Sequence, residues 1–296
     1  MTGIRSRIVV GLDGSPESLT AARWAAHDAR LRGLPLHLVH TYSIPAVGMI
    51  GYTVPTALTD GLYATGEQIL ADARTELHAT YPDLEITDRL VQADPRPVLV
   101  GESAEAALTV VGNRGGGRIP DVVLGSVAVH VAAHARSPVA VIPAGSAAPT
   151  AAVGPVRLGV DGSPISEAAV GFAFDEADRR RAILQAVIVW DDADLRGLVA
   201  AGTPLDLVED GKEHALLAEQ LAGWRDKYPD VVVEPVVHRG RAAAALLQAD
   251  DGPAPQMIVV GSRGRGGFTG LLLGSTSHSL IGHSPWPVLV VRPHTH

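Results

Sequence analysis

The chain has 296 residues, 46% of them hydrophobic and 19% charged, which suits a globular protein with room for two domains of about 150 residues. The absence of cysteine excludes disulfides, thiolate metal sites and thiol catalysis, and a formal net charge of −8 argues against a broad nucleic-acid surface. No apolar run reaches the roughly 18 residues that cross a bilayer. Because the N-terminal stretch has no secretory h-region, we expect a cytoplasmic protein without membrane insertion.

Apolar runs alternate with helical periodicity along the first half of the chain. Strands are predicted at Ile8–Leu12, Leu36–Thr41, Leu84–Val91, Ala107–Val111 and Val139–Ile142. Helices are predicted after Pro16, with Ser15 or Ser18 as the cap, and at Gly61–Tyr81, Pro97–Glu105 and Gly125–Ala135. Continuous Val/Ile/Leu strands separated by helices are typical of a parallel sheet that is covered on both faces. The pattern predicts a five-stranded α/β domain.

The second half of the chain repeats the first in the same order. IVVGLDGSPES at Ile8–Ser18 matches VRLGVDGSPIS at Val156–Ser166, and RSPVAVIP at Arg136–Pro143 recurs within His283–Pro293. Between the halves lies a stretch of small residues and prolines, which is typical of a linker. We therefore predict a tandem duplication, with domains at 1–143 and 156–296 and a linker at 144–155.

One glycine motif occurs in both halves. It reads VVGNRGGGRIPDVVLGSV at Val110–Val127 and VVGSRGRGGFTGLLLGST at Val259–Thr276, with the shared spacing Gly, two residues, Gly, nine residues, Gly-Ser. The motif residues are Gly112, Gly115, Gly125 and Ser126 in the first copy and Gly261, Gly264, Gly274 and Ser275 in the second. Glycines let backbone N–H groups approach an anion, and a following helix start adds its positive dipole end. The motif therefore predicts a phosphate cradle in each half.

An aspartate is predicted to face each cradle. If the strand order is 3-2-1-4-5, which is an assumption at the level of sequence, the winding reverses between strands one and four, where open α/β sheets bind ligands. Asp13 follows strand one and Asp161 matches it, so each can accept hydrogen bonds from a ribose or a base. The alternatives are an Asx turn for Asp-Gly-Ser, positive-φ loops for the glycines and ordinary helix caps for the serines.

Together these motifs resemble the universal stress protein family over nearly the whole chain, and more closely its tandem actinobacterial, ATP-binding members. The resemblance implies two doubly wound, five-stranded, Rossmann-like parallel-sheet domains of the adenine nucleotide alpha hydrolase-like type, with strand order 3-2-1-4-5. It also implies one ATP site per domain. Independently of the resemblance, a triphosphate is most simply held with Mg²⁺ bridging its oxygens.

The same resemblance assigns roles to individual positions of this sequence. Asp13 and Asp161 would contact ribose and adenine, and Thr41 and Val189 would lie against the base. The glycines near the ribose would be Gly11, Gly112, Gly159 and Gly261. The phosphates would be held by Gly115, Gly125, Ser126 and Val127, and by Gly264, Gly274, Ser275 and Thr276. Thr276 departs from the usual valine, and Arg265 adds a charge where the first copy has Gly116.

Other charged and titratable residues near the motif have open roles. Arg114 and Arg263 lie beside the glycine loop and either screen phosphate charge or face solvent. His130 and His134 have i, i+4 spacing, which suits a metal site, and the alternative is helix packing or surface roles, which we favour because no third ligand is apparent in the segment. Neither loop offers an evident catalytic base, so efficient ATP turnover is not predicted. Walker A and dinucleotide-binding patterns are absent.

A regulatory role in stress or growth is what the resemblance implies for the whole chain, with a regulatory protein partner that the sequence does not identify. The segments Ser43–Leu62 and Asp191–Leu207 are interpreted as lids or as connectors. The last strands, Val139–Ile142 and Val288–Val291, are interpreted as apolar sheet edges, which favour strand pairing. The resemblance implies that the two halves pair through these strands, and a homodimer is a separate hypothesis. The alternatives are a slow ATPase or nucleotide-transfer enzyme, and an interaction scaffold with vestigial sites.

Overall fold

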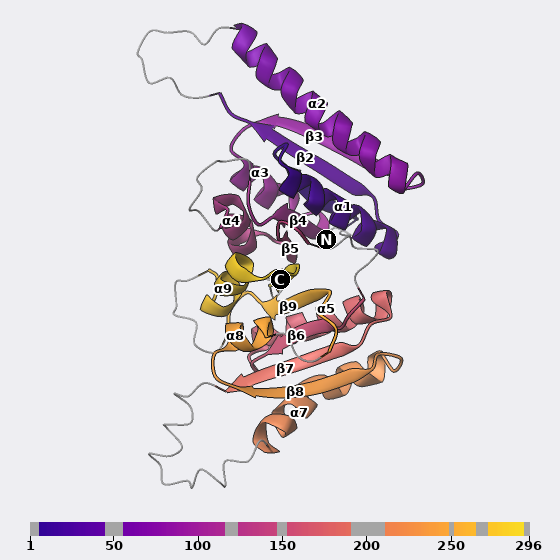
Figure 1. The fold of residues 1–296 in the computed structure, drawn as a ribbon, viewed down its shortest axis with the longest axis vertical. Coiled ribbons are helices and arrows are strands. Elements are labelled where there is room, and N and C mark those ends of the chain that lie inside the picture. The colour runs from indigo at the N-terminus through magenta and orange to yellow at the C-terminus, as the bar shows by residue number, and fades with distance from the viewer. Residues whose placement is uncertain are drawn as a thin grey trace. The chain divides into compact units, whose positions relative to one another are not determined.

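The computed structural model describes residues 6–44, 56–115, 124–146, 153–190, 211–248, 252–264 and 272–292. The chain divides into two compact units, Met1–Thr150 and Ala151–His296, and each is described by itself (Figure 1). Both units alternate strands and helices along the chain, as the apolar runs predict. Within the described residues, no helix combines the length and the apolar character that a bilayer crossing requires.

The N-terminal unit is a doubly wound parallel sheet. Its elements are β1 (Arg7–Leu12), α1 (Pro16–Arg32), β2 (Leu36–Tyr42), α2 (Thr56–Thr80), β3 (Ile86–Gln92), α3 (Pro95–Glu102), β4 (Ala106–Gly112), α4 (Ser126–His134) and β5 (Val139–Ile142). The strands lie in the order β3-β2-β1-β4-β5, and their pairs are parallel. This confirms the predicted order 3-2-1-4-5.

The C-terminal unit repeats this architecture. Its elements are β6 (Val156–Val160), α5 (Pro164–Arg180), β7 (Leu184–Trp190), α7 (Gly211–Lys227), β8 (Val233–Arg239), α8 (Ala242–Leu247), β9 (Met257–Gly261), α9 (Ser275–His283) and β10 (Val288–Val291). The strand order β8-β7-β6-β9-β10 is again 3-2-1-4-5, with parallel pairs.

Both faces of the N-terminal sheet are covered by helices. Right-handed crossovers place α1 and α2 on one face and α3 and α4 on the other. In agreement, α1 contacts α2 while α3 contacts α4 (Figure 1). The central strands β1 and β4 are largely buried, whereas β3, at the end of the sheet, exposes polar side chains such as Asp88 and Arg89. The helices thus bury the central strands from solvent on both faces of the sheet.

Two predicted helix starts were wrong. The second helix begins at Thr56 rather than Gly61, because nothing lies within 4 Å of a Cβ on Gly61 and the helix runs through that glycine unperturbed. The third begins at Pro95 rather than Pro97, because the Asp94 carboxylate accepts a hydrogen bond from Arg96 N at 2.8 Å and caps the helix. Of the predicted lid Ser43–Leu62, the part from Thr56 is therefore helical.

Candidate functional site

The predicted site residues gather where β1 and β4 end. These strands are parallel neighbours, with Val10 opposite Val110, and the winding of the sheet reverses between them. Asp13 directly follows β1, and Gly112 is the last residue of β4. In open α/β sheets the crevice beyond such a reversal is where ligands bind. The strand order therefore brings the acid and the glycine motif of this unit to the same edge.

The two carboxylate oxygens of Asp13 have different neighbours. Oδ1 accepts hydrogen bonds from Ser15 N at 3.0 Å and from Ser15 Oγ at 2.5 Å, across Gly14 with φ +81°. This is the Asx turn that the sequence offered as an alternative. Oδ2 faces the glycine loop, because a Cβ on Gly115 would lie 2.6 Å from it. The turn thus orients the acid toward the loop after β4.

The C-terminal unit contains the same arrangement. Asp161 Oδ1 accepts a hydrogen bond from Ser163 N at 2.9 Å, and Gly162 has φ +73°. A Cβ on Gly264 would lie 2.5 Å from Asp161 Oδ2. The acid and the second glycine of the motif are therefore juxtaposed in both units.

Close approach, rather than backbone conformation, explains the motif glycines. The described glycines with positive φ are Gly14, Gly33, Gly145, Gly162 and Gly240, and none belongs to the motif. Instead, Gly125 N donates a hydrogen bond to Asn113 O at 2.8 Å, and a Cβ there would lie 3.0 Å from the same oxygen. Gly274 N likewise donates to Ser262 O at 2.7 Å. The positive-φ alternative is therefore wrong, because the loop and the helix start pack backbone against backbone.

The helices that follow the motif begin without a side-chain cap. Gly125 and Gly274 are the N-cap residues of α4 and α9, and neither helix has a side-chain hydrogen bond at its cap. By contrast, Ser15 Oγ caps α1 by accepting from Ser18 N at 3.1 Å. Ser126 and Ser275 are the first helical residues, so the alternative that they are ordinary helix caps is wrong. First-turn N–H groups have no intrahelical acceptor and carry the positive dipole end.

The remaining predicted residues lie on the elements around this edge. Thr41 and Val189 lie near the ends of β2 and β7, and Val127 and Thr276 lie in the first turns of α4 and α9. Gly11 and Gly159 lie within β1 and β6, where a Cβ would meet Leu99 and Leu246 at 3.0 Å. Arg114 is exposed and Arg263 is half-buried. Gly112 and Gly261 end β4 and β9, and the ligand contacts of all these residues stay predictions.

Sequence reasoning missed a buried histidine beside this site. His40 lies one residue before Thr41, and its Nδ1 is 2.8 Å from Leu12 O, directly before Asp13. The C-terminal unit has Ile188 at the matching position, so repeat comparison alone gives no signal for it. His40 therefore tethers the end of β1 in the N-terminal unit through a contact that an isoleucine side chain cannot make.

The two histidines of α4 stack on each other. The His130 and His134 rings lie 4.1 Å apart, and His134 Nδ1 is 2.8 Å from His130 O. Burial, with the neighbouring His134, lowers the pKa of His130. Among the described residues, no group of three or more His, Asp or Glu side chains is placed to hold a metal ion. The predicted lid Asp191–Leu207, the central part of Ser43–Leu62 and Arg265 lie outside the described residues.

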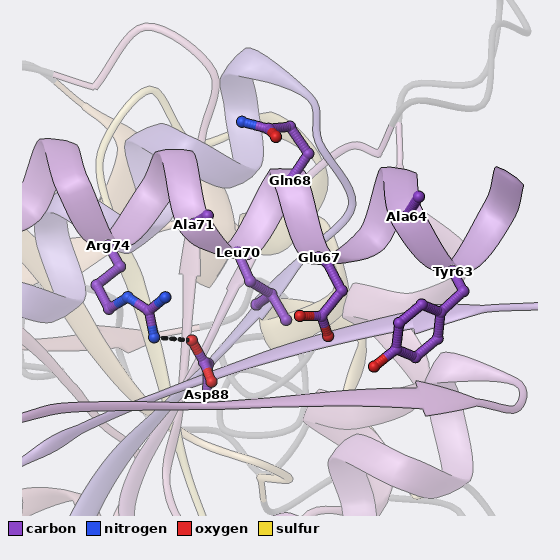
Figure 2. A pocket seen from close by; sticks show the side chains of 8 residues that line it. All are labelled: Tyr63, Ala64, Glu67, Gln68, Leu70, Ala71, Arg74 and Asp88. Atoms are coloured by element: carbon purple, nitrogen blue, oxygen red, sulfur yellow. Dashed lines mark hydrogen bonds and ion pairs between the residues drawn. The ribbon is translucent and has the colours of Figure 1, made fainter. Parts of the chain in front are cut away.

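A separate groove of about 520 Å³ lies between α2 and β3 (Figure 2). Its lining includes Tyr63, Glu67, Arg74 and Asp88, and Arg74 Nη1 donates a hydrogen bond to Asp88 Oδ2 at 2.6 Å. The Glu67 carboxylate raises the pKa of Tyr63. None of the predicted site residues lines this groove.

Comparisons with known proteins agree with the duplicated architecture. The sequence model of the universal stress protein family matches residues 5–143 and again residues 154–292. Universal stress protein Rv2623 of Mycobacterium tuberculosis is 38% identical over 291 residues, which cover 96% of this chain and 96% of that protein. Universal stress protein Rv2005c of the same organism is 40% identical over 289 residues, 96% of each chain. The crystal structure of a universal stress protein from Archaeoglobus fulgidus shares the fold, with a TM-score of 0.74 at 18% identity over 98% of this chain and 97% of that one.

Proposed function

The chain belongs to the universal stress protein family, with two domains of that family in tandem, and we propose that each unit binds one ATP, with Mg²⁺, to regulate a protein partner. The observation that carries the proposal is the juxtaposition of Asp13 with Gly115, repeated by Asp161 with Gly264. In each unit an acid directly after the first strand faces a glycine loop, and a helix start without a side-chain cap follows that loop.

The phosphates are assigned to the loop and the helix start. Backbone N–H groups of Gly115, Ser126 and Val127, and of Gly264, Ser275 and Thr276, supply donors without the bulk of a capping side chain. The positive dipole end of each helix favours the negative tail. Mg²⁺ would supply neutralisation of the phosphate charge, and its ligands would be phosphate oxygens and water, because the N–H donors of the loop cannot coordinate a cation.

The sugar and base are assigned to the opposite side of the crevice. Asp13 and Asp161 offer carboxylate oxygens to a ribose hydroxyl or a base amine, while Thr41 and Val189 flank the base. The Asx turns hold each acid in one orientation before any ligand arrives. Preorganised groups of this kind reduce the entropy that binding must overcome.

Regulation then follows from population shift. A nucleotide that orders the glycine loop must bind one conformation of the chain more tightly than another. The partner would then bind the surface that this conformation presents. The identity of the partner, a cytoplasmic location and homodimer formation remain predictions.

Calorimetry with Mg-ATP on the full chain tests the proposal. We expect about two ATP per chain for the wild type, because the cradle is duplicated. Gly115→Val and Gly264→Val should each reduce this to about one, since a side chain there meets the facing aspartate, and the double variant should not bind. Gly101→Val and Gly223→Val are matched controls, because nothing lies within 4 Å of a Cβ at either position.

Other outcomes would support different functions. Steady-state phosphate release that depends on Asp13 or Asp161 would indicate an enzyme. An unchanged melting temperature in excess Mg-ATP would indicate a scaffold with vestigial sites, because a ligand that binds only the folded state must stabilise it. Undiminished ATP binding in the double glycine variant would contradict the proposal.

A further inference from the structure

The two units differ at the ends of their last two strands. In the N-terminal unit, Asn113 follows β4, and its Oδ1 accepts a hydrogen bond from Ala144 N at 3.1 Å. In the C-terminal unit, Ser262 takes the place of Asn113, and the residue that matches Ala144 is Pro293, which has no backbone N–H. Ser262 is 1% exposed, and its Oγ has no hydrogen-bond partner. The substitution thus leaves a buried hydroxyl without the interaction that its counterpart makes.

Two arginines stand next to Ser262, one in the chain and one on the neighbouring strand. Arg263 follows Ser262, and Arg292 follows β10, where the N-terminal unit has Pro143. Arg263 Nε and Arg292 Nη1 are buried without a hydrogen-bond partner. Burial and then the positive charge of Arg263 lower the pKa of Arg292, so the two guanidinium groups are close enough to repel each other.

Strand pairing brings these groups together. β9 and β10 are parallel neighbours with Val291 opposite Gly261, and Ser262 N continues the ladder by donating to Val291 O at 2.8 Å. Ser262 and Arg292 therefore occupy the next paired positions. Residues paired in register on neighbouring strands project from the same face of a sheet. The hydroxyl and the Arg292 guanidinium consequently share one face at the end of β9 and β10.

Three buried donors without acceptors are unfavourable in the absence of a ligand. An unsatisfied buried polar group costs free energy, and two neighbouring cations add repulsion. A doubly charged oxyanion removes both problems, because it offers several acceptor oxygens and attracts both guanidinium groups. Phosphate has this charge and this number of oxygens.

We propose that Ser262, Arg263 and Arg292 form a phosphate-binding subsite that the C-terminal unit has and the N-terminal unit lacks. Ser262 and Arg263 belong to the loop Gly261–Gly264, so the subsite adjoins the predicted cradle. The phosphate group has two sources, the terminal phosphate of a nucleotide in the adjacent site or free inorganic phosphate. The first source rests on the proposed function, whereas the second does not.

Thermal unfolding of the full chain tests the subsite with sodium phosphate as the probe, against sodium chloride at equal ionic strength. Arg292→Gln should raise the melting temperature without phosphate, because it removes a repelling, unsatisfied buried cation. The same variant should bind phosphate about tenfold more weakly than the wild type, as expected for one lost charge-assisted hydrogen bond. Arg263→Gln should likewise raise the melting temperature without phosphate and weaken phosphate binding. Arg225→Gln, which removes an exposed charge on α7, is the matched control and should change neither quantity.

Titration of Mg-ATP and of AMP into Gly115→Val, which leaves only the C-terminal site, identifies the source. If the nucleotide supplies the phosphate, Arg292→Gln in this background should weaken Mg-ATP binding about tenfold and leave AMP binding unchanged. If inorganic phosphate is the ligand, phosphate should stabilise the wild type even where Mg-ATP does not, and the subsite stands although the proposed function fails.

Two results would overturn the subsite while leaving ATP binding intact. The first is that Arg292→Gln binds Mg-ATP and phosphate as tightly as the wild type does. The other is a lower melting temperature of unliganded Arg292→Gln, which would show that the arginine already has a stabilising partner. No response of the wild type to either Mg-ATP or phosphate would overturn both proposals.

Discussion

Asp13 and Gly115 meet where β1 and β4 end, so closely that a Cβ on Gly115 would lie 2.6 Å from Asp13 Oδ2. Asp161 and Gly264 repeat the relationship at 2.5 Å. Each pair joins the first strand of a unit to the loop after its fourth strand. The acid cannot swing freely away, because hydrogen bonds from Ser15 or Ser163 hold its other oxygen.

Gly115→Ala should destabilise the N-terminal unit by about 1 to 2 kcal/mol, because the new methyl group must displace a fixed carboxylate or the loop. In an Asp13→Ala background the same substitution should cost almost nothing, because the obstructing atoms are gone. Urea unfolding of the four chains of this cycle measures the coupling. Gly101→Ala is the control and should stabilise by up to about 1 kcal/mol, as expected for a helical glycine in open space. Equal costs of Gly115→Ala in both backgrounds would contradict the contact.

Gly171→Ala should destabilise the C-terminal unit by about 1 to 3 kcal/mol although alanine favours helices. A Cβ at Gly171 would overlap the Trp224 ring, which stacks with Phe174 and with Tyr228 at 6.3 Å from each. Denaturant unfolding followed by near-ultraviolet circular dichroism detects both the lost stability and the disturbed aromatic cluster. Gly223→Ala on α7 has nothing within 4 Å and should be neutral or stabilising. A neutral Gly171→Ala would show that the tryptophan moves aside without cost.

Glu102→Gln should cost about 1 kcal/mol, because it removes the charge of a buried carboxylate that pairs with two arginines still partly in contact with solvent. Glu102 is 6% exposed and accepts hydrogen bonds from Arg7 Nη2 at 2.8 Å and from Arg89 Nη1. Glu105→Gln removes an exposed partner of the same Arg7 and should change the free energy of unfolding by less than about 0.5 kcal/mol. Chemical denaturation of both variants at neutral pH provides the comparison, and equal effects would argue against a buried ion-pair network.

His37 should make the N-terminal unit lose stability in mild acid. Burial, followed by the charge of Arg7, lowers the pKa of His37 from 6.5, so the unfolded chain binds its proton more tightly than the folded chain. The stabilisation from neutral His37 is therefore complete above pH 6.5 and is lost as the pH falls toward the lower folded value. The charged groups that act on the ring are Arg7, Arg89, Glu102 and Asp88.

His37→Gln isolates this effect, because the matching residue of the C-terminal unit is Gln185. Glutamine can retain a hydrogen bond to Thr87 Oγ1, which lies 2.8 Å from His37 Nδ1. Free energies of unfolding measured at about pH 7.5 and about pH 5.5 should show a smaller loss for the variant than for the wild type. Identical losses would place the acid sensitivity elsewhere.

Local patterns in the sequence were enough to predict the fold class and the duplication, whereas the strand order was an assumption that the structure confirmed. Apolar runs and helical periods report burial residue by residue, and turn residues such as Pro16 report where helices begin. The start of α2 could not be predicted in this way, because Gly61 and Gly66 both lower helix propensity. Gly66 is retained in the helix because a Cβ there would lie 2.6 Å from Leu90 Cδ1, so α2 packs closely on the sheet.

The repeated spacing also predicted the candidate site, because turn preference alone does not explain two copies of one motif. Only the tertiary structure showed why each motif glycine is needed, since the obstructing groups, Asp13 for Gly115 and Asn113 O for Gly125, are brought there by other parts of the fold. The same holds for Ser262 and Arg292, which lie on different strands and meet because β9 pairs with β10. Sequence determines the residues and their local conformation, but contacts between distant residues depend on which strands become neighbours.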